Sequence, residues 1–150
     1  MSKFAIALII TVSFLSNIVL NADEDLENLL AQHKGKVVLV DFWASWCGPC
    51  LRSFPWMNAL SKELNPSEFA IIAINVDSDK AAADKFLQEH PANFSMIYDP
   101  EGEYAKQFEV DAMPSSFLIS RIGDIVHHQR GFQNKNTDLY RSLIEIELKQ

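Results

Sequence analysis

The chain has 150 residues, of which 48% are hydrophobic and 22% are charged, as expected for one compact domain with a buried core. Its 20 acidic and 13 basic side chains give a formal net charge of -7, so we expect no general attraction to nucleic acid or to anionic lipid. No repeat, low-complexity tract or long run of one charge marks a linker.

The N-terminus predicts export. Lys3 precedes an apolar run over residues 4–20, which ends before the acidic residues 23–25. This pattern favours a secretory signal peptide over residues 1–22 and a folded domain over 23–150. The alternative is an uncleaved membrane anchor through residues 4–20, because the run approaches the roughly 20 apolar residues of a spanning helix. In both cases we expect the domain in the periplasm or otherwise outside the cytoplasm.

The rest of the chain alternates between helical and strand patterns. Apolar residues every three or four positions predict helices, and short continuous apolar runs predict strands buried on both faces. In chain order we predict a helix over 24–32, a strand over 37–43, a helix with Leu51, Phe54, Met57, Leu60 and Leu64 on its inner face, a strand over 69–76, a helix over 81–90, a strand over 94–98 and a helix over 104–108.

The last part of the chain predicts a hairpin and a helix. The strands at 116–120 and 125–129 are separated by a short turn. A final helix over 138–148 is capped by Asn136 or Thr137, and we expect Leu139, Leu143 and Ile146 to face inward. Strands that alternate with helices predict an α/β fold with a mixed central sheet flanked by helices.

The chain contains two cysteines, both in the segment Trp46-Cys47-Gly48-Pro49-Cys50. A disulfide across so short a loop removes little entropy from the unfolded chain, so redox or metal chemistry explains the pair better than stability does. The first cysteine lies where a strand leads into a helix, and the helix N-terminus favours an anion there. We therefore predict that Cys47 is the nucleophile that forms a mixed disulfide with a substrate and that Cys50 resolves it.

The flanking residues fit a site that binds substrate around the cysteines. Gly48 allows the turn at little steric cost, and Pro49 has the backbone angle preferred in a first helical turn. Trp46 and Trp43 would wall the site with apolar surface, although Trp43 is equally well explained as a core residue.

Asp41 is the other candidate catalytic residue. A carboxylate in a doubly buried strand is costly unless it is partnered or neutral. We predict a raised pKa and a proton exchange with Cys50 during resolution. The alternative is a structural aspartate held by hydrogen bonds.

Metal binding is the alternative use of the cysteine pair. A zinc site needs two further ligands. His127 and His128 are neighbours on a predicted strand, so they point to opposite faces and cannot both reach one metal. We expect no metal site and assign no role to a histidine.

The segment from Val40 to Cys50 closely resembles the active-site segment of thioredoxin. Together with the apolar N-terminus, the continuation to Pro55, the helix–strand unit over 81–98 and the stretch 113–119, it resembles the exported TlpA/ResA-like branch. The resemblance implies a thioredoxin fold with an extra helix–strand insertion. It also implies that Pro114 is a cis-proline beside the cysteines, and that Met113 and Pro114 pair with the backbone of an incoming peptide.

Two residues depart from the family pattern. Many ResA-like proteins have a glutamate three residues after the second cysteine, where this chain has Ser53, and thioredoxin has a lysine near the buried aspartate, where this chain has Ala73. Without a cationic neighbour, Asp41 should be harder to ionise.

The resemblance implies an exported thiol:disulfide oxidoreductase, with no cofactor besides the redox-active cysteine pair. We expect a monomer that reduces disulfides of partner proteins in cytochrome c maturation or copper-site assembly. A transmembrane electron donor of the DsbD/CcdA type would recharge it. The alternatives are a disulfide oxidase or isomerase, a protein that handles copper or zinc through the same thiolates, and a non-catalytic binding module that uses the Pro114 face.

Overall fold

A computed structural model describes residues 25–150, so the signal peptide or anchor expected over 1–22 lies outside the described residues. Within that range no helix is both long and apolar enough to cross a membrane. The elements in chain order are α1 (Leu26–Gln32), β1 (Val37–Trp43), α2 (Gly48–Glu63), β2 (Phe69–Asn75), α3 (Lys80–Glu89), β3 (Ser95–Tyr98), α4 (Glu103–Gln107), β4 (Ser115–Ile119), β5 (Ile125–Arg130), a 3-10 turn (Asn134–Asn136) and α5 (Thr137–Leu148).

The strands of the described chain form one mixed sheet in the order β3-β2-β1-β4-β5. The strand β1 pairs in parallel with β2, and β2 pairs in parallel with β3. The hairpin of β4 and β5 completes the sheet, with β4 antiparallel to β1. This is the expected α/β architecture, and α3 with β3 forms the expected helix–strand unit at one edge.

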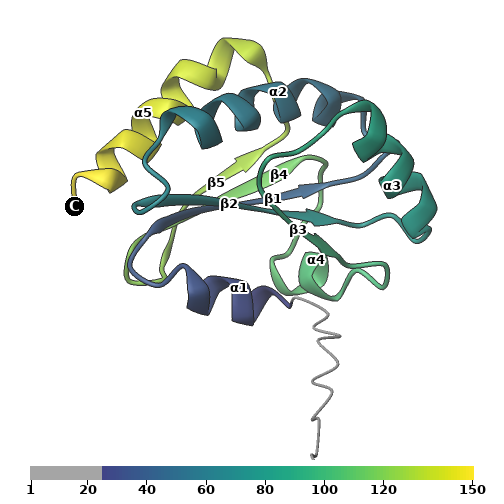
Figure 1. Ribbon diagram of the computed structural model, residues 1–150, viewed down its shortest axis with the longest axis horizontal. Helices are drawn as coiled ribbons and strands as arrows, with labels where there is room; N and C mark the ends of the chain where they lie inside the picture. The colour runs from purple at the N-terminus through teal and green to yellow at the C-terminus, as the bar shows by residue number, and fades with distance from the viewer. Residues whose placement is uncertain (1–24) are drawn as a thin grey trace, which may run out of the picture.

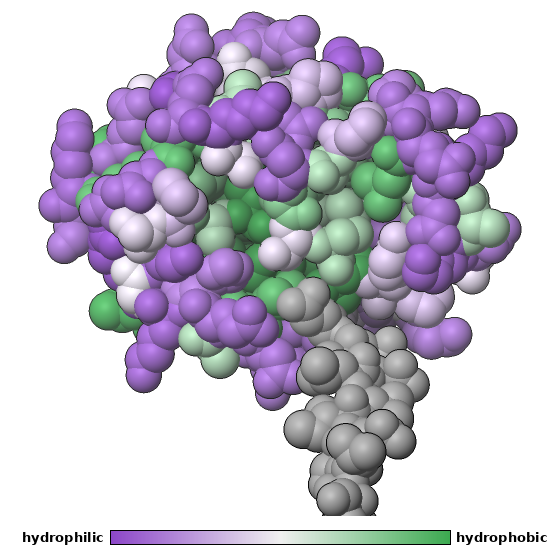
Figure 2. Space-filling model, in the orientation of Figure 1, coloured by the Kyte–Doolittle hydropathy of each residue, from purple (hydrophilic) through white to green (hydrophobic). Residues whose placement is uncertain are grey.

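Helices cover both faces of the sheet (Figure 1). The helices α2, α3 and α5 lie on one face, and α1 and α4 lie on the other. Side chains of β1 alternate between these faces, because Val37, Leu39 and Trp43 join the core under α2 whereas Val38 and Val40 join the core above α1. On the face shown in Figure 2, hydrophilic side chains cover the periphery and hydrophobic ones gather at the centre, between the helical layers.

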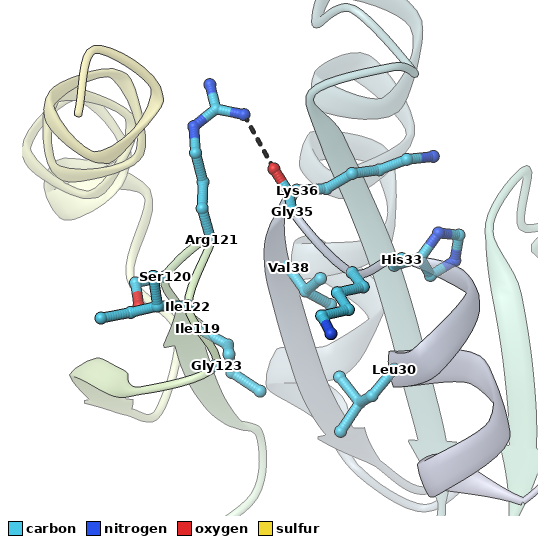
Figure 3. A pocket seen from close by; sticks show the side chains of 11 residues that line it. Leu30, His33, Gly35, Lys36, Val38, Ile119, Ser120, Arg121, Ile122 and Gly123 are labelled. Carbon is cyan, nitrogen blue, oxygen red and sulfur yellow. Dashed lines mark hydrogen bonds between the residues drawn. The ribbon is translucent and has the colours of Figure 1, made fainter.

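The cavity in Figure 3 lies at the end of the sheet where β1 begins. Its volume is about 400 Å³, and it is lined by the turn before β1 and by the hairpin between β4 and β5. The guanidinium of Arg121 donates to the carbonyl oxygen of Gly35 at 3.1 Å and to that of Leu148 at 2.8 Å. Arg121 thereby joins the hairpin to the turn before β1 and to the end of α5.

Some helix faces differ from the sequence prediction. In α2, Phe54, Met57 and Leu60 are buried as expected, but Leu51 is 43% exposed. In α5 the buried residues are Tyr140 and Ile144, and Leu143 packs against the same core as predicted. Leu139 and Ile146 are 66% and 53% exposed, so their inward orientation was predicted wrongly. The helix α5 carries two overlapping apolar stripes, and the one that includes the tyrosine packs on the sheet. Asn136 occupies the cap position, but its side chain makes no capping hydrogen bond.

Candidate active site

The two cysteines lie where β1 leads into α2. Cys47 is the N-cap residue of α2, and Pro49 and Cys50 belong to its first turn. The two sulfurs form a disulfide with an S–S length of 2.09 Å and a Cα–Cα distance of 5.3 Å. The Cys50 backbone N–H donates to the Cys47 sulfur at 3.3 Å. The helix N-terminus therefore directs a donor at Cys47, the arrangement that favours a thiolate there.

The two sulfurs differ in their access to the surface. Cys50 is completely buried, and Cys47 is 3% exposed. Cys47 lines a groove of about 540 Å³, which lies between residues 46–49 on one side and residues 110–113 on the other. Cys50 does not line it. A partner that occupies this groove meets Cys47 first.

The groove brings together most of the predicted substrate-binding residues. Trp46, Gly48 and Pro49 line it on the side of α2, and Met113 lines it on the opposite side. Trp46 is 69% exposed, which makes it the largest apolar surface beside the disulfide. The Met113–Pro114 peptide bond is cis, as the family resemblance implies, and the Gly131 backbone N–H donates to the Pro114 carbonyl at 2.7 Å.

Trp43 does not wall the site. Its side chain is fully buried and packs against Phe54 and Phe86, with ring centroids 4.9 and 4.8 Å apart. Its indole N–H points to the Met96 sulfur at 3.1 Å. Of the two interpretations that the sequence left open for Trp43, the core residue is the correct one.

The loop between β1 and the cysteines is held by a carboxylate that sequence reasoning missed. Asp77 is 6% exposed and accepts from both the backbone N–H and the hydroxyl of Ser45, each at 2.8 Å. The Asn75 amide donates to the same carboxylate at 2.7 Å. Because β2 runs parallel to β1, polar residues at its C-terminal end fall beside the start of the cysteine loop. The sequence Asn75-Val76-Asp77 at the end of a buried strand was the available signal.

Asp41 is buried in the centre of the sheet and is 1% exposed. By the alternation of β1 its side chain lies on the α2 face, which also carries Cys50. Its Oδ1 accepts from the Ser116 hydroxyl at 2.5 Å, and its Oδ2 has no hydrogen-bond partner in the described part of the chain. Burial raises the pKa of Asp41 from 3.8 to about 7, and the Ser116 hydrogen bond opposes this rise. The raised pKa agrees with the sequence prediction and lets Asp41 exchange a proton near neutral pH.

The two positions that depart from the family pattern lie close to this region. Ala73 lies directly beside Asp41 on the neighbouring strand β2, where it offers no charge. Ser53 is 2% exposed and donates to the Cys50 carbonyl at 3.1 Å. Its hydroxyl therefore serves the first turn of α2 itself.

The histidines on β5 point to opposite faces, as predicted. The ring of His127 contacts the ring of Tyr140, with centroids 5.4 Å apart, whereas His128 stacks on Phe117 at 4.1 Å. Among residues 25–150 no group of three or more histidine, cysteine, aspartate or glutamate side chains is placed to hold a metal ion.

A mixed sheet with a cysteine pair at the start of α2, and Met113 of a cis Met113–Pro114 bond across the groove, defines a thioredoxin-fold protein. The chain belongs to the Redoxin family, which it matches over residues 14–143. The thiol-disulfide oxidoreductase ResA of Bacillus thuringiensis is 34% identical over 106 residues, which cover 71% of this chain and 61% of that protein. The ResA protein of Geobacillus kaustophilus is 31% identical over 121 residues, covering 81% of this chain and 69% of the relative.

Solved structures agree with this fold. A putative thiol:disulfide interchange protein DsbE from Chlorobium tepidum is 39% identical, with a TM-score of 0.77 over 79% of this chain and 84% of that one. StoA from Bacillus subtilis is 21% identical, with a TM-score of 0.63 over 73% of this chain and 82% of that one, and shares the fold.

Proposed function

We propose that the protein is an exported thiol:disulfide oxidoreductase that reduces disulfides of partner proteins and uses no cofactor besides the Cys47–Cys50 pair. The observation that carries the proposal is the difference between the two sulfurs. Cys47 lines the groove and its sulfur accepts an N–H from the first turn of α2, whereas Cys50 is fully buried and does not line the groove. The names of the ResA and DsbE relatives support the same activity. The apolar N-terminal segment supports export.

The reaction begins with the reduced protein. The Cys47 thiolate attacks one sulfur of a substrate disulfide, a new S–S bond forms between them, and the other substrate sulfur leaves as a thiolate. The Cys50 sulfur then attacks Cys47, which forms the internal disulfide and releases the second substrate sulfur with its electron pair. The substrate gains two electrons, and the protein ends in the oxidised state that the structure shows.

Asp41 is proposed to take part in the second step. Cys50 attacks as a thiolate, so its proton must leave before the S–S bond forms. A carboxyl group with a pKa of about 7 on the same face of the sheet is partly ionised at neutral pH and can accept that proton. Asp41 would later return it when an electron donor reduces the disulfide.

We propose the reducing direction on the basis of the Gly48-Pro49 spacer and the family resemblance. Thioredoxin has a potential near -270 mV and the oxidant DsbA one near -120 mV, so the two directions are well separated. The proposed partners are disulfides formed in cytochrome c maturation or copper-site assembly, and the proposed electron source is a transmembrane donor of the DsbD/CcdA type. A measured Cys47–Cys50 potential above about -150 mV would instead establish an oxidase or isomerase.

A trapping experiment tests the proposal and names the partner. In the Cys50→Ser variant the resolving thiol is missing, so Cys47 should remain joined to the substrate in a stable mixed disulfide. Mass spectrometry of disulfide-linked complexes from the exported fraction identifies the partner, and the Cys47→Ser/Cys50→Ser variant is the control. The wild-type protein should also reduce insulin disulfides. Tight binding of copper(I) or zinc by a reduced protein that cannot reduce insulin would favour metal handling instead.

A further inference from the structure

Tyr140 of α5 reaches the same buried region as Asp41. The side chain is 4% exposed, and its ring stacks on Trp56 with centroids 5.5 Å apart and an interplanar angle of 18°. Its hydroxyl is buried and has no hydrogen-bond partner among residues 25–150. Burial raises the pKa of Tyr140, and the negative charge of Asp41 raises it further. The phenol therefore stays neutral and keeps its proton available for donation.

Ser116 connects the two groups. It lies directly opposite Asp41 in the pairing of β1 with β4, and its hydroxyl donates to Asp41 Oδ1. Ser116 also lowers the pKa of Tyr140, which places its hydroxyl close to the phenol as well as to Asp41. The three side chains come from three different elements and meet on the α2 face of the sheet.

Among residues 25–150, no lysine or arginine acts on Asp41. The other titratable groups that face it are the cysteines of α2 and His127 of β5, which contacts the Tyr140 ring. On the β2 side the neighbour of Asp41 is Ala73. Within the described chain, the pKa of Asp41 responds to its burial and to Ser116, and to no positive charge. An ionised Asp41 must therefore be stabilised by neutral donors.

We propose that Ser116 and Tyr140 are positioning residues whose hydroxyl groups together stabilise the ionised form of Asp41 in place of a cationic side chain. Ser116 already donates to Oδ1. Tyr140 donates to the second carboxylate oxygen when Asp41 loses its proton, which satisfies both orphaned buried atoms at once. The inference rests on the proposed oxidoreductase function, because it assigns the groups that tune the proton acceptor of the resolving step.

The consequence is a proton acceptor that works near neutral pH. A hydrogen bond to a charged group stabilises it enough to move a pKa by about one unit. If loss of the Ser116 donor raises the pKa of Asp41 from about 7 to about 8, the ionised fraction at pH 7 falls roughly fivefold. The rate of the resolving step at pH 7 should fall by the same factor, and the pH profile should move upward.

The test is a titration of the Asp41 carboxyl carbon by NMR in the oxidised protein, in which the cysteines do not titrate. We expect Tyr140→Phe and Ser116→Ala each to raise the pKa of Asp41 by about one unit. Ser116→Thr keeps a hydroxyl at the same position and should restore the wild-type value. Tyr98→Phe is the matched control, because it removes a phenol that donates to the exposed Asp84 at 2.8 Å, outside the cluster.

The second readout is the pH profile of single-turnover resolution, measured with and without Asp41→Asn. In the Asp41→Asn background, Tyr140→Phe and Ser116→Ala should have no further effect on the profile. The inference is overturned if the pKa of Asp41 is unchanged in both Tyr140→Phe and Ser116→Ala. It is also overturned if these substitutions still shift the pH profile in the Asp41→Asn background. Either result leaves the proposed reductase activity standing. If wild-type protein fails to reduce insulin, the proposed function fails, whereas the titration still decides whether the two hydroxyls stabilise Asp41.

Discussion

Asp41 is a titratable residue whose burial links the pH to stability as well as to chemistry. Its pKa is raised from 3.8 to about 7 in the folded protein. Between these values the folded state holds a proton that the unfolded state releases. Stability from this group is therefore complete below about pH 4, falls as the pH rises through 7, and then stays constant.

We predict that Asp41→Asn removes this pH dependence. A shift of this size lowers the free energy of unfolding of the wild-type protein by about 4 kcal/mol between pH 4 and pH 8. The variant has no carboxyl group at this position, so its free energy of unfolding should lack this decrease. Urea unfolding of both oxidised proteins across this pH range measures the difference. Parallel stability curves for the two proteins would show that Asp41 titrates like a surface carboxylate.

The two cysteines should react in a fixed order in the native reduced protein. We predict that iodoacetamide labels Cys47 much faster than Cys50, because Cys47 lines the groove and Cys50 is fully buried. Peptide mapping after short exposure gives the order, and labelling in denaturant provides the control in which both react. Equal native labelling would contradict the assignment of nucleophile and resolving thiol.

Among the elements, strands were easier to predict than helix faces. The runs over 37–43 and 69–75 are apolar except for Asp41 and Asn75 and are almost entirely buried, so burial on both faces leaves no face to choose. The helix α5 offers Leu139, Leu143 and Ile146 or Tyr140 and Ile144 as inward stripes, and the sequence pattern does not distinguish them. Tertiary packing decides: it buries the phenol of Tyr140 where the charge of Asp41, almost 100 residues earlier, raises its pKa, and no local pattern reveals this proximity.

A pair of substitutions in α5 tests the observed face. Ile144 is fully buried and Ile146 is 53% exposed, so the same change at the two positions should have different effects. We expect Ile144→Ala to lower the free energy of unfolding by about 2–5 kcal/mol and Ile146→Ala by less than about 1 kcal/mol. Denaturant unfolding at one pH measures both values, and a larger loss for Ile146→Ala would restore the face first predicted from the sequence.

At the scale of the whole molecule, the sequence predicted the order of elements, the position of the cysteine pair at the start of a helix and the raised pKa of Asp41. It did not predict the partners of the site. Asp77 beneath the cysteine loop and the hydroxyls of Ser116 and Tyr140 reach the site through strand pairing and helix packing. These contacts depend on the register between elements, which a single sequence does not specify.

The net charge of -7 predicts a preference for positively charged substrates. We predict that a disulfide peptide of charge about +2 is reduced several-fold faster than one of charge about -2 at low salt, because the field of the protein attracts the former. At about 0.5 M salt the two rates should converge, since ions screen the field. Second-order rate constants at the two salt concentrations test this, and a salt-independent ratio would assign the preference to contacts in the groove.

The hairpin between β4 and β5 lies at the opposite end of the sheet from the cysteines, because β4 runs from the cis-proline back to the start of β1. One strand of seven residues, or roughly 20 Å, separates them. Ile122 at its tip is 85% exposed, and Arg121 fixes the base of the hairpin to Gly35 (Figure 3). If the protein is attached to a sensor chip through this tip, by a chemistry that does not react with cysteine, its groove will be directed toward the solution.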